Sequence, residues 1–274
     1  MFYLTKEDWE MYILPKLNEA NTFLNEFKYL KKIYSTMKFI ISNLKIYNPI
    51  VLSTSMIYYH QYCVLQDFNL SSLENCNKFY FISACLFIAT KSTNHLVSIN
   101  QIIKIIQQIF EKKFPEKKIL DDEIKNNILN YELKILDALG FNLNIETPYK
   151  FFGVIKQYLI TKKESINSDI NKLTDVLNFY INDTFILPLH LYFTPNVIAI
   201  SSFLLLKNNF HLDSINLKEI MNLSEYLIDI NEVYECYNLF RKIYIDESQL
   251  KNSKSDSLKS LSTTISKNEE KINV

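Results

Sequence analysis

The chain has 274 residues, of which 48% are hydrophobic and 14% aromatic, so it can bury one large core or two smaller ones. Thirty basic residues balance thirty acidic ones and Arg241 is the only arginine, so no overall charge favours binding to nucleic acid or to an acidic membrane. With Gly140 and Gly153 as the only glycines, the chain cannot form a glycine-rich phosphate-binding loop.

Long segments with an apolar helical period and few helix breakers predict an all-α protein. A first helix is expected over residues 5–27, capped by Thr5 and bent near Pro15. A second is expected over residues 30–46. The other helices of the first half are expected at 51–65, at 76–91, from Ser98 to Lys113, and from Asp121 or Asp122 to a C-terminal cap at Gly140.

The second half repeats this organisation. Thr147 and Pro148 are typical of a helix start and predict a helix from Tyr149. Further helices are expected at 168–185, 194–207, 217–221 and 224–244. At an offset of 116 residues, 194–207 matches the end of the helix at 76–91, and both carry small residues in the middle that allow close helix packing. The sequence therefore predicts two five-helix repeats.

Two charged residues lie on otherwise apolar helix faces. Lys91 continues a face that carries Phe81, Ala84, Cys85 and Ile88 at helical spacing. Glu132 has apolar residues three and four positions away on both sides, namely Ile128, Leu129, Ile135 and Leu136. An isolated buried charge is costly unless it finds an opposite partner. Lys91 and Glu132 are therefore expected to point at each other or at one shared partner.

Three passages together resemble the cyclin box: FYFISACLFIATK, ILNYELKILDALGFNLNIETPYKFF and LYFTPNVIAISSFLL. The resemblance is to the transcription-associated cyclins, in particular cyclin H and cyclin C, and covers about residues 30–245. It implies an N-terminal helix at 1–29, a first, kinase-binding cyclin box at 30–143 and a second box at 144–245. Residues 246–274 are rich in Ser, Lys and Asn without an apolar period, which predicts a flexible tail.

The resemblance implies a non-catalytic regulatory subunit that binds a cyclin-dependent kinase and activates it by holding its αC helix in the active position. Lys91 and Glu132 would be the polar pair that binds this helix, and Ile88, Leu136 and Phe141 would form the apolar seat around them. No cofactor and no metal is implied. Family members usually carry an acidic pair soon after the lysine, whereas this chain has Asn94, which bears on the choice of kinase.

A cyclin H-like chain would act in the kinase-activating kinase and TFIIH, and would link transcription to the cell cycle. The expected location is the nucleus, and an additional cytoplasmic pool is left open. A cyclin C-like chain would belong to the Mediator kinase module. A third assembly subunit or a transcription complex is a further expected partner. The rival interpretations are a TFIIB-like, DNA-bound factor, which the neutral charge disfavours, and a scaffold that activates no kinase. The N-terminal helix is expected to pack on the kinase or on the second repeat.

Other candidate sites are weaker. His60 and Cys63 have the spacing of two metal ligands on one helix, but packing within an aromatic-rich helix is favoured because no second pair has suitable spacing. The remaining histidines, His95, His190 and His211, are scattered, and no nucleophile, base and acid can be grouped into a catalytic set. No apolar run approaches eighteen residues, so no membrane-spanning helix is expected.

Overall fold

The computed structural model describes residues 3–66, 75–116, 119–163, 169–225 and 227–244, and every regular element within them is a helix. The N-terminal elements are α1 (Lys6–Asp8), a π-helical turn (Trp9–Ile13) and α2 (Leu14–Asn18). The first helix group is α3 (Ala20–Asn43), α4 (Pro49–Leu65), α5 (Asn75–Ser92), α6 (Ile99–Lys113) and α7 (Asp121–Ala138). The second is α8 (Tyr149–Thr161), α9 (Ile170–Thr184), α10 (Pro195–Asn209), α11 (Leu217–Met221) and α12 (Ile230–Phe240), with 3-10 turns at Pro188–Leu191 and Arg241–Tyr244.

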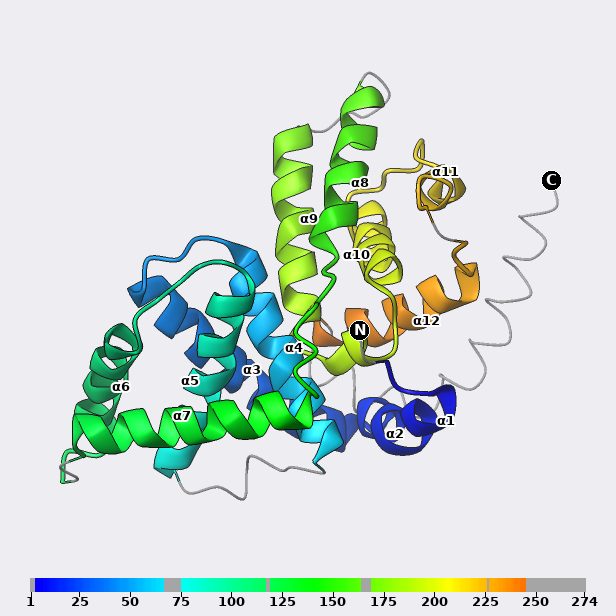
Figure 1. The fold of residues 1–274 in the computed structure, drawn as a ribbon. Coiled ribbons are helices and arrows are strands. Elements are labelled where there is room, and N and C mark those ends of the chain that lie inside the picture. Colours follow the sequence, from blue (N-terminus) through cyan, green and yellow to red (C-terminus); the bar gives the residue numbers. More distant parts are fainter. Residues whose placement is uncertain (1–2, 67–74, 117–118, 164–168, 226, 245–274) are drawn as a thin grey trace.

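The two groups of five helices lie side by side, joined by the segment between α7 and α8 (Figure 1). This arrangement confirms the predicted all-α fold with two five-helix repeats. The predicted flexible tail, residues 246–274, lies outside the described residues. In the described ranges, no helix combines the length and the apolar character that a membrane span requires.

The N-terminal part of the chain differs from the prediction. One continuous helix, α3, replaces the expected helix end near Phe27 and new start at Leu30, because no glycine, proline or capping residue interrupts the apolar period there. The chain turns instead at Glu19, whose extended backbone separates α2 from α3. Residues 3–29 are thus not one helix, and the exact boundaries of the two cyclin boxes stay a prediction.

Each helix group is built around one helix that is buried on all sides. In the first group α5 packs mainly against α4 and α7, and in the second α10 packs mainly against α12 and α9. Small residues make these contacts close: the Ser201 hydroxyl of α10 lies 2.7 Å from the Val197 carbonyl oxygen and 3.0 Å from that of Val233 on α12. The predicted role of the small residues in the central helices is confirmed for this pair.

The last helix starts six residues later than predicted. α12 begins at Ile230 rather than Ser224, because Asp229 caps it by accepting a hydrogen bond from the Asn231 backbone N–H (2.9 Å). The apolar period of the segment also starts at Ile230. A capping aspartate followed by an apolar period was therefore the better signal of the helix start.

The N-terminal segment packs on the second helix group, one of the two positions expected for it. Trp9 is fully buried, with its ring stacked on Tyr192 (5.0 Å between centroids) and edge-on to Phe193 (5.7 Å). The Leu4 backbone N–H donates a hydrogen bond to the Leu191 carbonyl (2.7 Å). The indole thus anchors α1 and α2 to the segment that leads into α10.

A half-buried lysine, Lys242, closes the same contact from the C-terminal side. The Lys242 ammonium donates hydrogen bonds to the Leu17 carbonyl (3.0 Å) and to the Asn18 side-chain oxygen (2.8 Å). Burial, together with a smaller effect of the nearby Arg241 charge, lowers the pKa of Lys242 to about 8. Below pH 8 Lys242 is protonated in the folded state, so folding carries the full free-energy cost of burying its charge.

Replacing Lys242 by methionine is therefore expected to change the pH dependence of folding. An unfolded lysine keeps its proton up to about pH 10.4, so between pH 8 and pH 10.4 the unfolded state binds more protons and wild-type stability rises with pH. Across this pH window, the free energy of unfolding of the wild type should rise by about 1–2 kcal/mol relative to that of Lys242→Met. This value is discounted for the partial exposure of the side chain. Urea unfolding at pH 7.5, 8.5 and 9.5 measures this, and parallel profiles would contradict it.

Candidate functional site

The two charged residues predicted to meet do so. Lys91, in the last turn of α5, forms an ion pair with Glu132, in the middle of α7. The Glu132 side chain is 9% exposed and the Lys91 side chain 43%, so the anion is buried and the cation reaches the surface. The ammonium also lies 4.1 Å from the centre of the Phe87 ring, one helical turn earlier, in a cation–π contact.

The pair leaves hydrogen-bonding capacity for a partner. An ammonium has three N–H donors and a carboxylate has two acceptor oxygens, whereas the Lys91–Glu132 bond uses one donor and one oxygen. The remaining donors are suited to backbone carbonyls of a second chain. Because Glu132 fixes the ammonium at one place, a partner that binds Lys91 does not have to order a mobile side chain.

The end of α7 is shaped by the predicted glycine cap. Gly140 has φ +56°, and its N–H donates to the Asp137 carbonyl (2.9 Å) while the Phe141 N–H donates to the Leu136 carbonyl (2.9 Å). These two bonds form a Schellman motif. Phe141 also has φ +56°, a left-handed conformation that is unfavourable for a bulky residue, and its side chain is 67% exposed.

The two glycines predict mutations of opposite sign. A Cβ added at either Gly140 or Gly153 would meet no atom within 4 Å, so only backbone conformation decides the outcome. Gly140→Ala forces alanine into the left-handed region and should lower the free energy of unfolding by about 1–2 kcal/mol. Gly153→Ala, within α8, should raise it by about 0.5–1 kcal/mol. Chemical denaturation measures both, and the same sign for both would contradict this account of the cap.

The end of α5 has the same cap, which explains why asparagine occupies position 94. Asn94 has φ +57°; its N–H donates to the Lys91 carbonyl (3.3 Å), and the His95 N–H donates to the Thr90 carbonyl (2.8 Å). Asparagine is one of the few residues other than glycine that adopt this conformation readily. The departure from the family pattern thus has a structural cause at the helix end.

His95 ties this turn to the start of α4. Its Nδ1–H donates to the Thr93 carbonyl (2.7 Å), so Nε2 is the acceptor for the Asn48 side-chain amide (3.1 Å). Asn48 is itself the cap of α4, because its side-chain oxygen accepts from the Ile50 N–H (3.0 Å). The end of α5 and the start of α4 are therefore held together by polar contacts near Lys91.

Tyr58 of α4 holds the segment that follows α7. Its fully buried hydroxyl lies 3.0 Å from both the Leu143 carbonyl oxygen and the Ser92 hydroxyl. Burial raises the pKa of Tyr58, so the phenol stays protonated and can donate. Tyr58 thus links the end of α5 to the joining segment behind the ion pair.

The three residues predicted to form the apolar seat differ in their exposure. Ile88 is 1% exposed and belongs to the core, so it supports the surface only from beneath. Leu136 is half-buried and Phe141 is exposed, so these two remain available to a partner. Sequence reasoning missed Leu96 and Leu133, which are exposed and lie in the turn after α5 and beside Glu132. Leu133 has helical spacing to Leu129 and Leu136, so that pattern could have found it, whereas Leu96 lies in a turn and follows no helical period.

Among the residues of the second helix group that the structure describes, no ion pair corresponds to Lys91–Glu132. Lys207 occupies the position of Lys91 in the repeat, but its ammonium donates to the Ile215 carbonyl of the chain's own following loop. This contact stabilises the loop and leaves no buried carboxylate beside the lysine. Within the described part of the chain, the first group alone combines a fixed cation with a buried anion at this helix end.

The histidines form one unexpected contact. The rings of His60 and His190, 130 residues apart in sequence, meet edge to face with 5.1 Å between centroids. Burial lowers the pKa of both, to about 3 for His190, so both are neutral and pack between α4 and the 3-10 turn before α10. Among the described residues, no three His, Cys, Asp or Glu side chains are grouped as metal ligands would be.

Comparisons with known proteins agree with this architecture. No protein-family model matches the sequence. The chain is 29% identical over 179 residues to Cyclin-T1-5 of Arabidopsis thaliana and 23% identical over 154 residues to human Cyclin-K. The alignments cover 62% and 55% of this chain but 28% and 24% of those proteins, so the chain spans about a quarter of the length of the curated relatives it matches.

The solved structures share the fold. A chain of the yeast RNA polymerase II CTD kinase CTDK-1 complex superposes with a TM-score of 0.66 at 18% identity, covering 91% of this chain and 76% of that one. A chain of the yeast TFIIK (Kin28/Ccl1/Tfb3) complex gives 0.55 at 15% identity, covering 88% and 96%. The protein therefore has the all-α cyclin fold. Its sequence relatives narrow this further, since it resembles the transcription-associated cyclins.

Proposed function

We propose that the chain is a regulatory subunit that binds and activates a cyclin-dependent kinase acting in transcription. The observation that carries the proposal is the Lys91–Glu132 ion pair at the surface of the first helix group. It is supported by the similarity to cyclins T and K and by the fold shared with kinase complexes. In this role the chain contributes no catalytic group and acts in the nucleus.

The pair would act on the kinase through its mobile αC helix. Lys91 would donate hydrogen bonds to backbone carbonyls of the kinase segment, and Glu132 would hold the ammonium in position. Leu136 and Phe141 would cover apolar side chains of the same segment. Fixing that helix inward lets its glutamate pair with the lysine that orients ATP, which is the requirement for an active kinase. The free energy that drives activation is then the difference between the chain's binding free energies for the active and the inactive kinase conformation.

The subtype is a narrower proposal. A cyclin H-like role, in a kinase-activating kinase and TFIIH, is supported by the likeness in fold to chains of TFIIK and of the CAK complex from Chaetomium thermophilum. The curated relatives by sequence are instead cyclins T1, K and L. We therefore propose a transcription-linked kinase as the partner and assign the chain to no single named complex.

Co-expression of the full chain with each cyclin-dependent kinase of its source organism tests the proposal. One kinase should co-purify at a 1:1 ratio, and its phosphotransfer to a serine-containing peptide should rise at least tenfold when the chain is present. Co-purification without a gain in phosphotransfer would favour the scaffold interpretation. The absence of any kinase that binds would contradict the proposal.

A further inference from the structure

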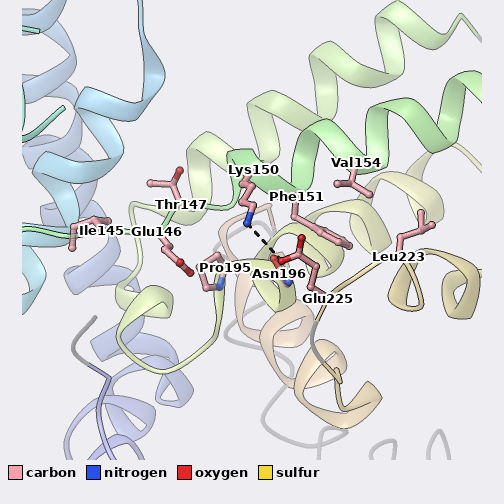
Figure 2. A pocket seen from close by; sticks show the side chains of 10 residues that line it. All are labelled: Ile145, Glu146, Thr147, Lys150, Phe151, Val154, Pro195, Asn196, Leu223 and Glu225. Atoms are coloured by element: carbon pink, nitrogen blue, oxygen red, sulfur yellow. Dashed lines mark ion pairs between the residues drawn. The ribbon is translucent and has the colours of Figure 1, made fainter. Parts of the chain in front are cut away.

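An open cavity of about 300 Å³ lies where the segment joining the two helix groups meets the second group (Figure 2). Its walls come from this segment, the first half of α8, the start of α10 and the loop after α11. The volume is at the lower limit of ligand pockets. It is suited to one or two side chains rather than to a nucleotide or a large cofactor.

The interior of the cavity is apolar and incompletely covered. Phe151 forms a buried part of the wall, Val154 is half-buried, and Leu223 at the edge is 43% exposed. A bulky apolar side chain packed against Phe151 would remove apolar surface of Val154 and Leu223 from water, which is favourable. The cavity therefore favours a leucine-sized or aromatic side chain.

The mouth of the cavity is rich in hydrogen-bond acceptors. Glu146 is exposed on one side, while Glu225 pairs with Lys150 across the mouth at 3.7 Å (Figure 2). The Asn196 amide N–H donates to the Ser224 hydroxyl (2.8 Å), so its carbonyl oxygen is left as an acceptor. Two carboxylates against one ammonium disfavour a phosphate or an acidic ligand and favour a cation.

The Lys150–Glu225 pair does not close the mouth. Its side chains are 82% and 75% exposed, and ion pairs this exposed contribute little to stability. An incoming lysine or arginine can take the place of Lys150 beside Glu225 while Lys150 moves into water. Exchange of one surface cation for another is therefore a low-cost way for a partner to enter.

We propose that this cavity docks a short segment of a partner protein, which inserts one bulky apolar side chain beside a lysine or arginine. The site is distinct from the Lys91–Glu132 pair but close along the chain to Phe141, which belongs to the surface proposed for the kinase. Ile145 at the cavity follows Phe141 by four residues, at most about 14 Å of extended chain. A partner docked here would lie next to the surface proposed for the kinase.

Fluorescence anisotropy with the full chain and labelled octapeptides tests this proposal. The probe set has a central leucine, phenylalanine or tryptophan flanked by lysine or arginine; matched sets have a central alanine or flanking glutamates. We expect the basic, apolar-centred peptides to bind at least tenfold more tightly than both matched sets. Equal binding of the three sets, no binding at all, or preference for flanking glutamates would each overturn the proposal.

Variants locate the binding. Val154→Trp fills the cavity and should weaken binding at least tenfold, whereas Ile160→Trp, on an exposed position of α8 outside the cavity, should not. Leu223→Ser, at an exposed position that tolerates substitution, should weaken binding without affecting folding. Glu132→Ala should bind the peptides as the wild type does, which separates this site from the kinase site. Binding that survives both Val154→Trp and Leu223→Ser would contradict the assignment.

Discussion

Replacing Glu132 by alanine is expected to weaken association with the kinase by about 2–4 kcal/mol, a roughly 30- to 1,000-fold rise in Kd. Glu132 is buried and holds the Lys91 ammonium beside the Phe87 ring. Without the carboxylate, the Lys91 side chain can turn into water, and a partner has to order it again on binding. Isothermal titration calorimetry of the chain with its co-purified kinase measures the change.

Two further variants separate binding from folding. Glu123→Ala removes an exposed carboxylate from the first turn of the same helix and should change Kd by less than about threefold. Lys91→Met leaves the buried Glu132 carboxylate without its cation, so it should lower the free energy of unfolding more than Glu132→Ala does. An unchanged Kd for Glu132→Ala, with the fold intact, would reject the role assigned to the pair.

Local sequence signals account for the parts of the site that were predicted correctly. Gly140 after an apolar period identified the end of α7, and Ser98 with Gln101 forms the capping box at the start of α6. The meeting of Lys91 and Glu132 followed from a single argument, that neither charge can remain alone on an apolar face. The kinase-binding role of these residues rests on the resemblance and stays a prediction.

Signals that depend on tertiary contacts were not readable in the sequence. The contact between His60 and His190 joins segments 130 residues apart, and no spacing rule connects them. The continuous α3 was missed because a break was expected between Phe27 and Leu30, where no residue that ends a helix occurs. The Phe87–Lys91 contact, by contrast, has i, i+4 spacing on one helix and was available to sequence reasoning.

Replacing Trp9 by alanine is expected to detach the N-terminal segment from the second helix group. A fully buried tryptophan contributes about 3–5 kcal/mol relative to alanine. The helical pieces that it anchors are three to five residues long, too short to persist alone in water. Amide protection in residues 3–18 should therefore fall by about 100-fold or more while the helices α4–α10 keep theirs, as measured by native-state hydrogen exchange.

The neighbouring exposed residues provide the matched controls for Trp9. Met11 and Tyr12 are 64% and 58% exposed in the same π-helical turn, so replacing either by alanine should leave amide protection within about threefold of the wild type. Protection that is equally lost in all three variants would show that the turn, rather than the indole packed on Tyr192, holds the segment. If Trp9→Ala also leaves kinase affinity unchanged, the segment acts on the second helix group alone, because a contact shared with the kinase would be lost when the segment detaches.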